Sequence, residues 1–498
     1  MIQNDQGIYL GVFIAFILFL ILVGIGVSRK VKNGEDFLMG GRGLSLPLLV
    51  GTSVATLVGT GSSMGAVGFT YSNGWGGALY GIGGSIGLFL LLYLFADVRK
   101  YNFVTYSEEM SFYYGANKLI KGLTSILLYI ASIGWLGAHI LGGSLYLTWI
   151  TGLDPIISKI LTACGFAIFT IIGGYLAVVI TDTIQGVILF LGFIMLTILS
   201  VMKIGGFSEM SNQLPSEMLS FLGVDKMGII PALSLAIVIA VGVLATPSYR
   251  HRIYSSSSIS VIKKGFLISG ILFAIFSLFP SIIGMAAYIM NPDLESGYAF
   301  PYLATEVFPV WIGAIILTSG LSATMSSGSS DYIAGVAILL EDIYPVFKGK
   351  SPKKEDMVKY SRIGLVLTLI IAFLFTLGSS GIIEYISNFV STVMSGLFVA
   401  TVLGKFWPRA TWQGGIASII GGSVVSFTIL FNEGLQTYWG NPIIPSLIGA
   451  LILGIIVSLI TPKNKVSKEE ANKILEKERA VTNESSANNN DTNNQVVM

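Results

Sequence analysis

A hydroxyl-rich run at residues 322–331 contains the side chains best suited to binding an ion. It reads Ser-Ala-Thr-Met-Ser-Ser-Gly-Ser-Ser-Asp and lies within a long, mostly apolar stretch. Ser326 and Ser327 offer two adjacent oxygens, and a small hard cation such as sodium prefers oxygen ligands. The same hydroxyls could instead donate to carbonyls of their own helix. Spacing alone leaves both interpretations open.

Two further segments resemble interruptions of membrane helices. Residues 54–63 contain two glycines and four Ser or Thr residues, and residues 242–247 end in Pro247, which lacks a backbone donor. Interrupted helices at matching positions in two halves indicate an inverted-repeat transporter, in which freed carbonyls and helix ends bind ions and substrate. Close packing of small residues is the alternative explanation for either segment alone.

The composition restricts the class of protein that holds these residues. Of the 498 residues, 53% are hydrophobic and 11% are charged, whereas soluble domains are about a quarter charged. These values exclude a soluble globular enzyme, a disordered chain and a nucleic-acid-binding protein, and the net charge of +2 gives no bulk attraction to nucleic acid. We predict an all-α integral membrane protein whose surroundings are a lipid bilayer.

Apolar segments separated by polar residues predict about 13 transmembrane helices. The segments are residues 8–28, 44–70, 77–96, 122–150, 157–180, 184–203, 228–247, 265–290, 306–340, 361–378, 384–404, 413–431 and 443–461. With the N-terminus outside, 26 of the 29 Lys and Arg residues fall in cytoplasmic loops or in the tail, which favours an N-out, C-in orientation. That assignment places Arg250, His251 and Arg252 on the cytoplasmic surface.

Residues 462–498 differ in composition from the rest of the chain. The run 483–490 has almost no apolar content, so we expect a disordered polar cytoplasmic tail, with a short solvated helix over 468–479. We assign the tail no chemistry. Residues 1–461 are expected to form a single transporter domain.

Several motifs, in order, resemble the sodium:solute symporter family over about residues 36–462. They are Glu35–Arg42, Gly65–Gly74, Gly173–Gln185, and Ala323–Ser330 followed by Glu341-Asp342-Ile343-Tyr344. The resemblance implies a LeuT-type five-plus-five inverted repeat. The core repeats would be about 44–203 and 228–404, and the peripheral helices 8–28, 413–431 and 443–461.

The resemblance also implies a sodium site. On the matched motifs, the family's ligands fall on the carbonyls of Ala55, Val58 and Ala323 and on the hydroxyls of Ser326 and Ser327. Asp182 matches a family aspartate implicated in ion release or in a second ion site. With or without a role in ion binding, it could cap the helix that begins at Thr183.

Departures from the family pattern bear on the substrate. Residues that hold sugar hydroxyls in sugar transporters are replaced by Gly81, Gly134 and Ser62, and the aspartate of proline transporters is replaced by Leu57. A sugar and proline are therefore both disfavoured. The remaining polar or aromatic candidates for the substrate cavity are Ser62, Tyr80, Trp135, His139 and Tyr249. For His139, a satisfied packing role is the alternative.

The sequence therefore predicts a secondary active transporter and not an enzyme. It would be a sodium-coupled symporter that imports a small organic solute, an organic acid or an amino acid by preference, by alternating access. Na+ is the expected coupling ion, and no organic cofactor is expected. The expected location is the cell membrane, and the compact loops favour a bacterial inner membrane.

A proton-coupled symporter using Asp182 or His139 is the nearest alternative, ahead of a channel or a membrane sensor. The oligomeric state stays open.

Overall fold

The computed structural model describes residues 2–29, 34–348, 352, 356–377 and 382–479. These residues are predominantly helical, and the bridge that pairs Leu44 with Ser256 is isolated. Ten described helices are long and apolar enough to cross a membrane, or eleven if the bent pair α11–α12 is one span. The segments expected at 44–70 and 157–180 contribute the shorter apolar helices Leu46–Leu57 and Pro155–Gly165. Thirteen spans and their orientation therefore remain predictions.

Both expected helix breaks lie in one packed group of helices. The group comprises α3 (Leu46–Leu57), α4 (Ala66–Asn73), α5 (Ala78–Phe95), α11 (Ile229–Ala245), α12 (Pro247–Ser255), α13 (Ile259–Phe276) and α14 (Leu278–Met290). Within it, α5 packs against α11 and α13, α3 against α13, and α4 against α14. The first two segments of each expected repeat thus lie together, as an inverted repeat would place them.

A second group supports the first. It comprises α7 (Lys118–Thr151), α8 (Pro155–Lys203), α16 (Val310–Ile338) and α18 (Met357–Phe375). Here α16 and α18 each pack against α7 and α8, so later members of the two expected repeats also meet. The hydroxyl-rich α16 contacts α3 as well, and this contact brings residues 322–331 to the first break.

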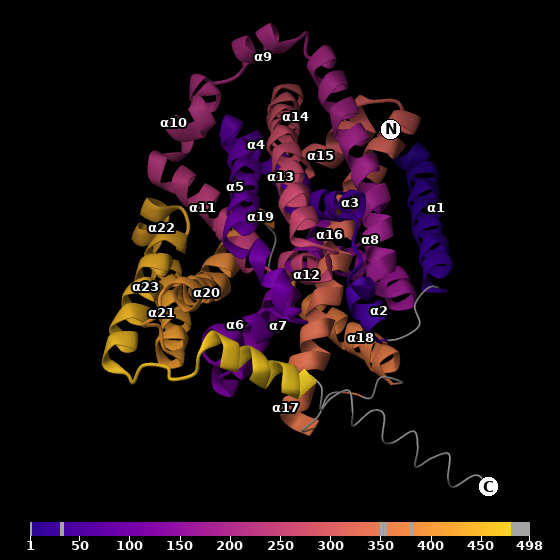
Figure 1. Cartoon of the computed structure of the whole chain (residues 1–498). Coiled ribbons are helices and arrows are strands. Elements are labelled where there is room, and N and C mark those ends of the chain that lie inside the picture. Colours follow the sequence, from indigo (N-terminus) through magenta and orange to yellow (C-terminus); the bar gives the residue numbers. More distant parts are fainter. Residues whose placement is uncertain (1, 30–33, 349–351, 353–355, 378–381, 480–498) are drawn as a thin grey trace, which may run out of the picture.

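The long helices α1 (Ile2–Ser28), α21 (Trp412–Leu430) and α23 (Ile443–Ile460) lie at the periphery (Figure 1). Nearer the centre, α19 (Ile382–Phe389) packs against α7, and α20 (Ser395–Phe406) packs against α11 and α21. Short helices join the long ones: α2 (Gly34–Met39), α6 (Tyr106–Tyr113), α9 (Phe207–Gln213), α10 (Val224–Met227), α15 (Ala299–Tyr302), α17 (Tyr344–Lys348) and α22 (Glu433–Trp439). Tighter or wider turns complete the described helices: η1 (Gly40–Arg42), η2 (Gly61–Gly65), η3 (Gly74–Gly77), η4 (Ala96–Tyr101), η5 (Ser216–Leu219), η6 (Phe221–Gly223), η7 (Ser296–Tyr298), η8 (Leu303–Val307), η9 (Leu339–Ile343) and η10 (Val390–Met394).

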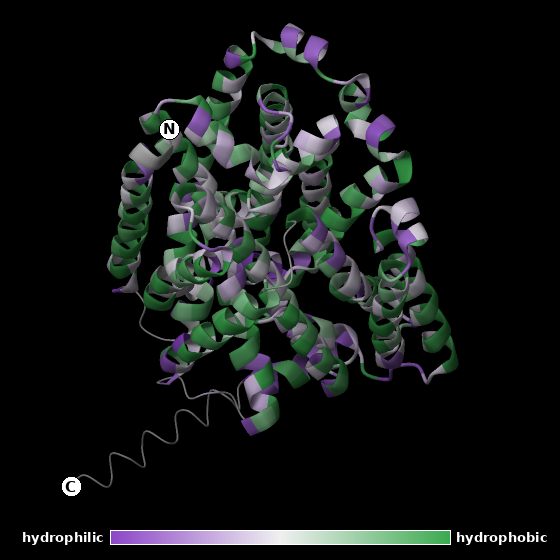
Figure 2. Ribbon diagram, turned by 180° about the vertical axis from the view of Figure 1, so that it is seen from behind, coloured by the Kyte–Doolittle hydropathy of each residue, from purple (hydrophilic) through white to green (hydrophobic). Residues whose placement is uncertain are grey.

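The outer surface matches a bilayer. Large apolar side chains are exposed along peripheral helices, for example Leu22 on α1, Leu191 on α8 and Ile452 on α23. Hydrophilic residues gather toward the two ends of the molecule (Figure 2). The N-terminus and the helix at 468–479 lie at opposite ends (Figure 1), as an odd number of crossings requires.

The expectation of a helix end at Asp182 is wrong. We expected a junction near Asp182, but α8 continues through Asp182, and its non-helical residue is Gly174, with φ 62° and ψ −162°. A Cβ at Gly174 would lie 2.7 Å from the Phe37 carbonyl oxygen, so close packing of α2 and a positive φ both require glycine here. Asp182 is therefore an interior helix residue and not a cap.

Residues 250–252 are also not surface residues. They belong to α12, and Arg250 and Arg252 have no exposed area while His251 is 4% exposed. The His251 ring packs on Tyr175, with centroids 4.5 Å apart. Because a buried cation needs partners, the two arginines must have a specific role in the interior.

The helix at residues 468–479 of the tail packs against the transporter. Residues 468–479 are helical, and Ala471 and Leu475 are buried against the transporter, although we expected a solvated helix. Arg479 pairs with Glu108 at 3.0 Å. The expected disorder of residues 480–498 concerns a part of the chain outside the described residues.

Candidate functional site

The end of α3 supplies unpaired carbonyls. Val58 (φ −80°, ψ 58°) leaves the helical region directly after Leu57, so the last carbonyls of the helix lose their usual backbone donors. Its N–H still bonds the Val54 carbonyl, at 2.9 Å. The carbonyls of Ala55, Thr56 and Leu57 are thereby left for other donors. This confirms the break expected in residues 54–63.

Serine hydroxyls from α16 fill two of these positions. Ser326 Oγ donates to the Ala55 carbonyl at 2.8 Å, and Ser327 Oγ donates to the Thr56 carbonyl at 2.8 Å. Ser327 Oγ also lies 3.2 Å from the Ala323 carbonyl oxygen and 3.4 Å from that of Ala55. Four of the five residues expected to bind sodium thus meet, although Ser326 and Ala55 are 271 residues apart in the sequence.

Val58 is the fifth residue expected to bind sodium, and only its position supports this expectation. It is fully buried at the end of α3, three residues beyond Ala55. Ser62, expected at the substrate cavity, instead donates to the Leu57 carbonyl at 2.6 Å. Ser62 therefore stabilises the break.

At the second break, as at the first, one residue leaves the helical region between two helical segments. α11 ends at Ala245, Thr246 is extended (φ −74°, ψ 129°), and α12 begins at Pro247 after a bend of 44°. Thr246 Oγ1 donates back to the Gly242 carbonyl at 2.5 Å. The break expected at residues 242–247 is confirmed.

Asp182 belongs to a buried polar group that adjoins the end of α3 through Thr56, whose hydroxyl donates to Ser330 Oγ at 3.1 Å. It accepts hydrogen bonds from Thr52 Oγ1 at 2.7 Å and Ser330 Oγ at 2.9 Å, and the Arg252 guanidinium lies 3.6 Å away. Arg252 also donates to Thr52 and Ser330 at 2.8 Å. Oδ1 of Asp182 is buried without a partner, so one carboxylate oxygen is free to accept a further ligand.

A cavity of about 40 Å³ lies between the two breaks. Its walls include four of the five expected substrate-cavity residues: Tyr80, Trp135, His139 and Tyr249. Small-molecule pockets measure several hundred Å³. Entry of an organic solute would therefore require these helices to move apart.

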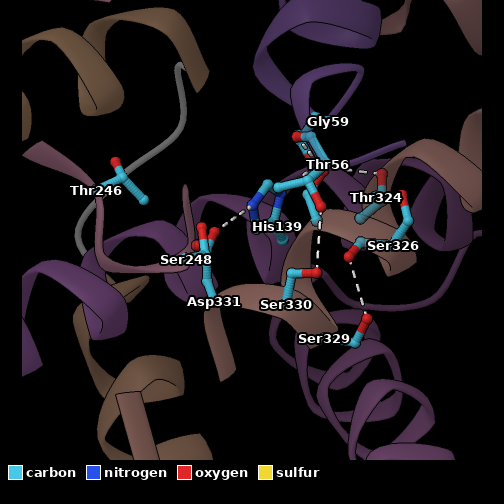
Figure 3. A network of polar contacts seen from close by, with 12 residues as sticks. Thr56, Gly59, His139, Thr246, Ser248, Thr324, Ser326, Ser329, Ser330 and Asp331 are labelled. Carbon is cyan, nitrogen blue, oxygen red and sulfur yellow. Dashed lines mark hydrogen bonds and ion pairs between the residues drawn. The ribbon is translucent and has the colours of Figure 1, made fainter. Parts of the chain in front are cut away.

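Sequence reasoning missed Asp331 as a site residue. It lies four residues after Ser327 on α16 and lines the cavity, and its Oδ2 is 3.3 Å from His139 Nε2 (Figure 3). His139 Nδ1 is 2.9 Å from Thr60 Oγ1, which donates to Thr324 Oγ1 at 3.3 Å. His139 therefore connects the cavity to the first break and is not a simple packing residue. The available signal was an acidic residue within an apolar helix.

Comparison with known proteins decides the family. The family model described as the sodium:solute symporter family matches residues 37–422. The chain belongs to the sodium:solute symporter family. The family predicted from the motifs is thus confirmed, and with it a multi-pass location in the cell membrane.

Curated relatives of the symporter match the chain along most of its length. A sodium/pantothenate symporter of Haemophilus influenzae is 28% identical, covering 89% of this chain and 95% of the relative. That of Escherichia coli is 26% identical, covering 88% and 94%. A sodium/proline symporter of Staphylococcus aureus is 25% identical, covering 90% and 92%. These relatives transport solutes with sodium, as their names state.

Solved structures confirm the fold. A Na+-coupled sialic acid symporter in a substrate-bound outward-open state superposes with a TM-score of 0.81, at 20% identity, over 92% of this chain and 99% of that chain. Mhp1, a nucleobase-cation-symport-1 family transporter, gives a TM-score of 0.61 at 13% identity, over 88% and 98%. The symporter therefore has the LeuT-type fold predicted from its motifs.

Proposed function

We propose that the symporter imports a small organic solute with sodium by alternating access, and that Ala55, Val58, Ala323, Ser326 and Ser327 bind the sodium ion. The observation that carries the assignment is the contact of two α16 hydroxyls with carbonyls freed at the end of α3. A sodium ion between them would exchange these hydrogen bonds for ion–oxygen contacts, and no carboxylate is needed.

The geometry also supplies a reason for coupling. The proposed ligands come from α3 in one packed group and α16 in the other. An ion that bridges them would stabilise the arrangement in which the two groups fit together at this level. Sodium would thus favour one conformation and complete the wall of the nearby cavity.

The sodium gradient is sufficient for uptake. A tenfold gradient contributes about 1.4 kcal/mol, and a membrane potential of about 100 mV adds about 2.3 kcal/mol per charge. Together, about 3.7 kcal/mol per ion supports roughly 500-fold accumulation of a neutral solute at one ion per solute.

Replacement of the serines tests the site. Ser326→Ala and Ser327→Ala should each raise the sodium concentration needed for half-maximal uptake by about tenfold, because each removes one oxygen ligand. Ser322→Ala is the matched control, since Ser322 is buried in the same helix and donates only to its own helix, at the Thr318 carbonyl. Unchanged sodium dependence in both variants would contradict the assignment.

Asp182 is proposed as an ion-release or second-ion position. Its free Oδ1 and the adjoining Ser330 hydroxyl support a further cation there. Arg252 would compete with that ion for the carboxylate, because it already lies 3.6 Å away. The Arg252 side chain would then have to shift whenever the ion binds.

Proton coupling is the second candidate, and the buried His139–Asp331 pair favours it. Both the imidazole and the carboxylate can carry a proton, and the other nitrogen of the imidazole contacts Thr60. Uptake measured in sodium-free medium at several pH values separates the two. Sodium coupling predicts no uptake there at any pH, and proton coupling predicts uptake that increases as the external pH falls.

A further inference from the structure

The cavity between the two helix breaks has an aromatic wall and one carboxylate. Tyr80, Trp135, Tyr249 and Phe273 line it, and Asp331 is the acidic residue among its lining side chains. The lining contains neither lysine nor arginine. The cavity is therefore a poor environment for a simple anion.

Asp331 is only partly satisfied by the protein. Its side chain is 5% exposed, and its Oδ2 lies 3.3 Å from His139 Nε2. A carboxylate can accept about four hydrogen bonds, and a buried charge with few partners is costly. The Asp331 carboxylate thus has capacity for a further cationic or donating group.

Arg252 does not supply that group. Its guanidinium is committed to Thr52, Ser330 and Asp182. His139 contacts Asp331 through Nε2 alone, because its Nδ1 faces Thr60 Oγ1. A cation that enters from the cavity would complete the coordination of Asp331.

Other lining atoms are unpaired. Trp135 Nε1 and Ser248 Oγ are buried without hydrogen-bond partners among the described residues, and both residues line the cavity. The indole N–H can only donate, so it requires an acceptor on whatever binds. The aromatic ring faces would stabilise a nearby positive charge.

We propose that the transported solute carries a positively charged amino group that binds Asp331, together with an acceptor group that reaches Trp135 and Ser248. The solute class is an organic cation or a zwitterion such as an amino acid, and not a simple carboxylic acid. This inference rests on the proposed transport function and narrows it, and it makes Asp331 the specificity-determining residue.

The test measures binding to the purified full-length symporter in detergent. Thermal stabilisation is recorded with and without sodium for ethanolamine, choline, γ-aminobutyrate and lysine, and for propionate, pyruvate and succinate as matched acids. Stabilisation should be confined to compounds with an ammonium group. In Asp331→Asn the affinity for those compounds should fall by about tenfold to a thousandfold, because a buried charge pair loses one partner.

Controls separate this inference from the coupling proposal. Asp331→Glu retains the charge and should recover binding, while Ser322→Ala should bind as the unaltered protein does. Stabilisation by the acids alone, or equal binding of amines in Asp331→Asn, would overturn the inference. Amine binding that needs Asp331 but not sodium would support the inference and contradict sodium coupling.

Discussion

Gly59 is the residue at which the proposed sodium site and the cavity meet. A Cβ at this position would lie 2.5 Å from Ser327 Oγ and 3.1 Å from the Cε1 atom of His139. No real Cβ tolerates the first distance, so Ser327 would have to move, and with it the oxygens proposed to bind sodium. The glycine thus allows the serine and the histidine to approach the same broken segment.

Gly59→Ala should therefore impair transport more than folding. We expect at least about a tenfold loss of sodium-dependent uptake with normal amounts of protein in the membrane, measured in proteoliposomes. Gly122→Ala is the matched control, because Gly122 lies in α7 and a Cβ there has nothing within 4 Å. Normal uptake by Gly59→Ala would show that Ser327 can move without loss of the site.

At this scale the sequence was informative about Ser326 and Ser327 but not about Asp331. Adjacent hydroxyls in an apolar helix are an unusual pattern that can be found without a structure. The role of Asp331 depends on His139, which is 192 residues away, and on cavity walls from several helices. Helical spacing does place Asp331 on the same face as Ser327. The position of Asp331 could therefore be predicted from the sequence, whereas its contact with His139 could not.

Among the helices, the one at residues 468–479 makes a contact with α6 that we did not expect from the sequence. Its last residue, Arg479, pairs with Glu108 at 3.0 Å and donates to the Asn102 carbonyl at 2.9 Å. Burial raises the pKa of Glu108 above its usual value, and Arg479 opposes this effect. The tail helix therefore stabilises the ionised form of a buried carboxyl on α6.

Arg479→Gln should destabilise the symporter in a pH-dependent way. Because the folded-state pKa of Glu108 is raised, stability from this group is greatest below its unfolded pKa and falls as pH rises through the folded value. Loss of Arg479 raises that pKa further, so the variant should lose more stability at pH 8 than at pH 5, by about 1–2 kcal/mol. Melting temperatures of the variant and the unaltered protein at both pH values measure this loss of stability. Arg479→Lys, which keeps the positive charge, is the control. An equal loss at both pH values would mean that only the carbonyl contacts matter.

Breaks within helices were predictable where the backbone itself forces them. Pro247 and the glycines near residue 59 mark both interruptions. The polar residues around Asp182 were misleading, because α8 continues past them and bends at Gly174, where the Phe37 carbonyl approaches. Asp182 and Arg252 are a buried pair of opposite charge. A pairing between helices that are distant in the sequence produces no periodic pattern from which it could be predicted.

On the scale of the whole molecule, the end that carries the tail helix is closed below the cavity. Arg250 pairs with Glu109 on α6 at 3.0 Å, with neither side chain exposed. Its guanidinium lies 3.4 Å from the centroid of the Phe95 ring. Arg252 joins α12 to α8 in the same way. For the cavity to open toward this end, which charge distribution predicts to be cytoplasmic, α12 must separate from α6 and α8.

The Arg250–Glu109 pair should therefore set how often that end opens. Removal of both charges in Arg250→Met/Glu109→Gln avoids an unpaired buried charge while it removes the pair's contribution to the closed state.

Cysteine labelling measures how often this end opens. With Cys164 replaced by Ser, a cysteine is placed at Val243, which lines the cavity. A membrane-impermeant maleimide applied from the cytoplasmic side reacts with this cysteine when the cavity opens toward that side. Labelling should be slow in the parent and severalfold faster in the double variant. Asp97→Asn breaks the Lys405–Asp97 pair at the same end, in which the aspartate is 52% exposed and the lysine 10%, and it should leave the labelling rate unchanged. Equal labelling in the parent and the double variant would mean that the closed end is held by apolar packing, and that the buried ion pair instead selects how α12 docks.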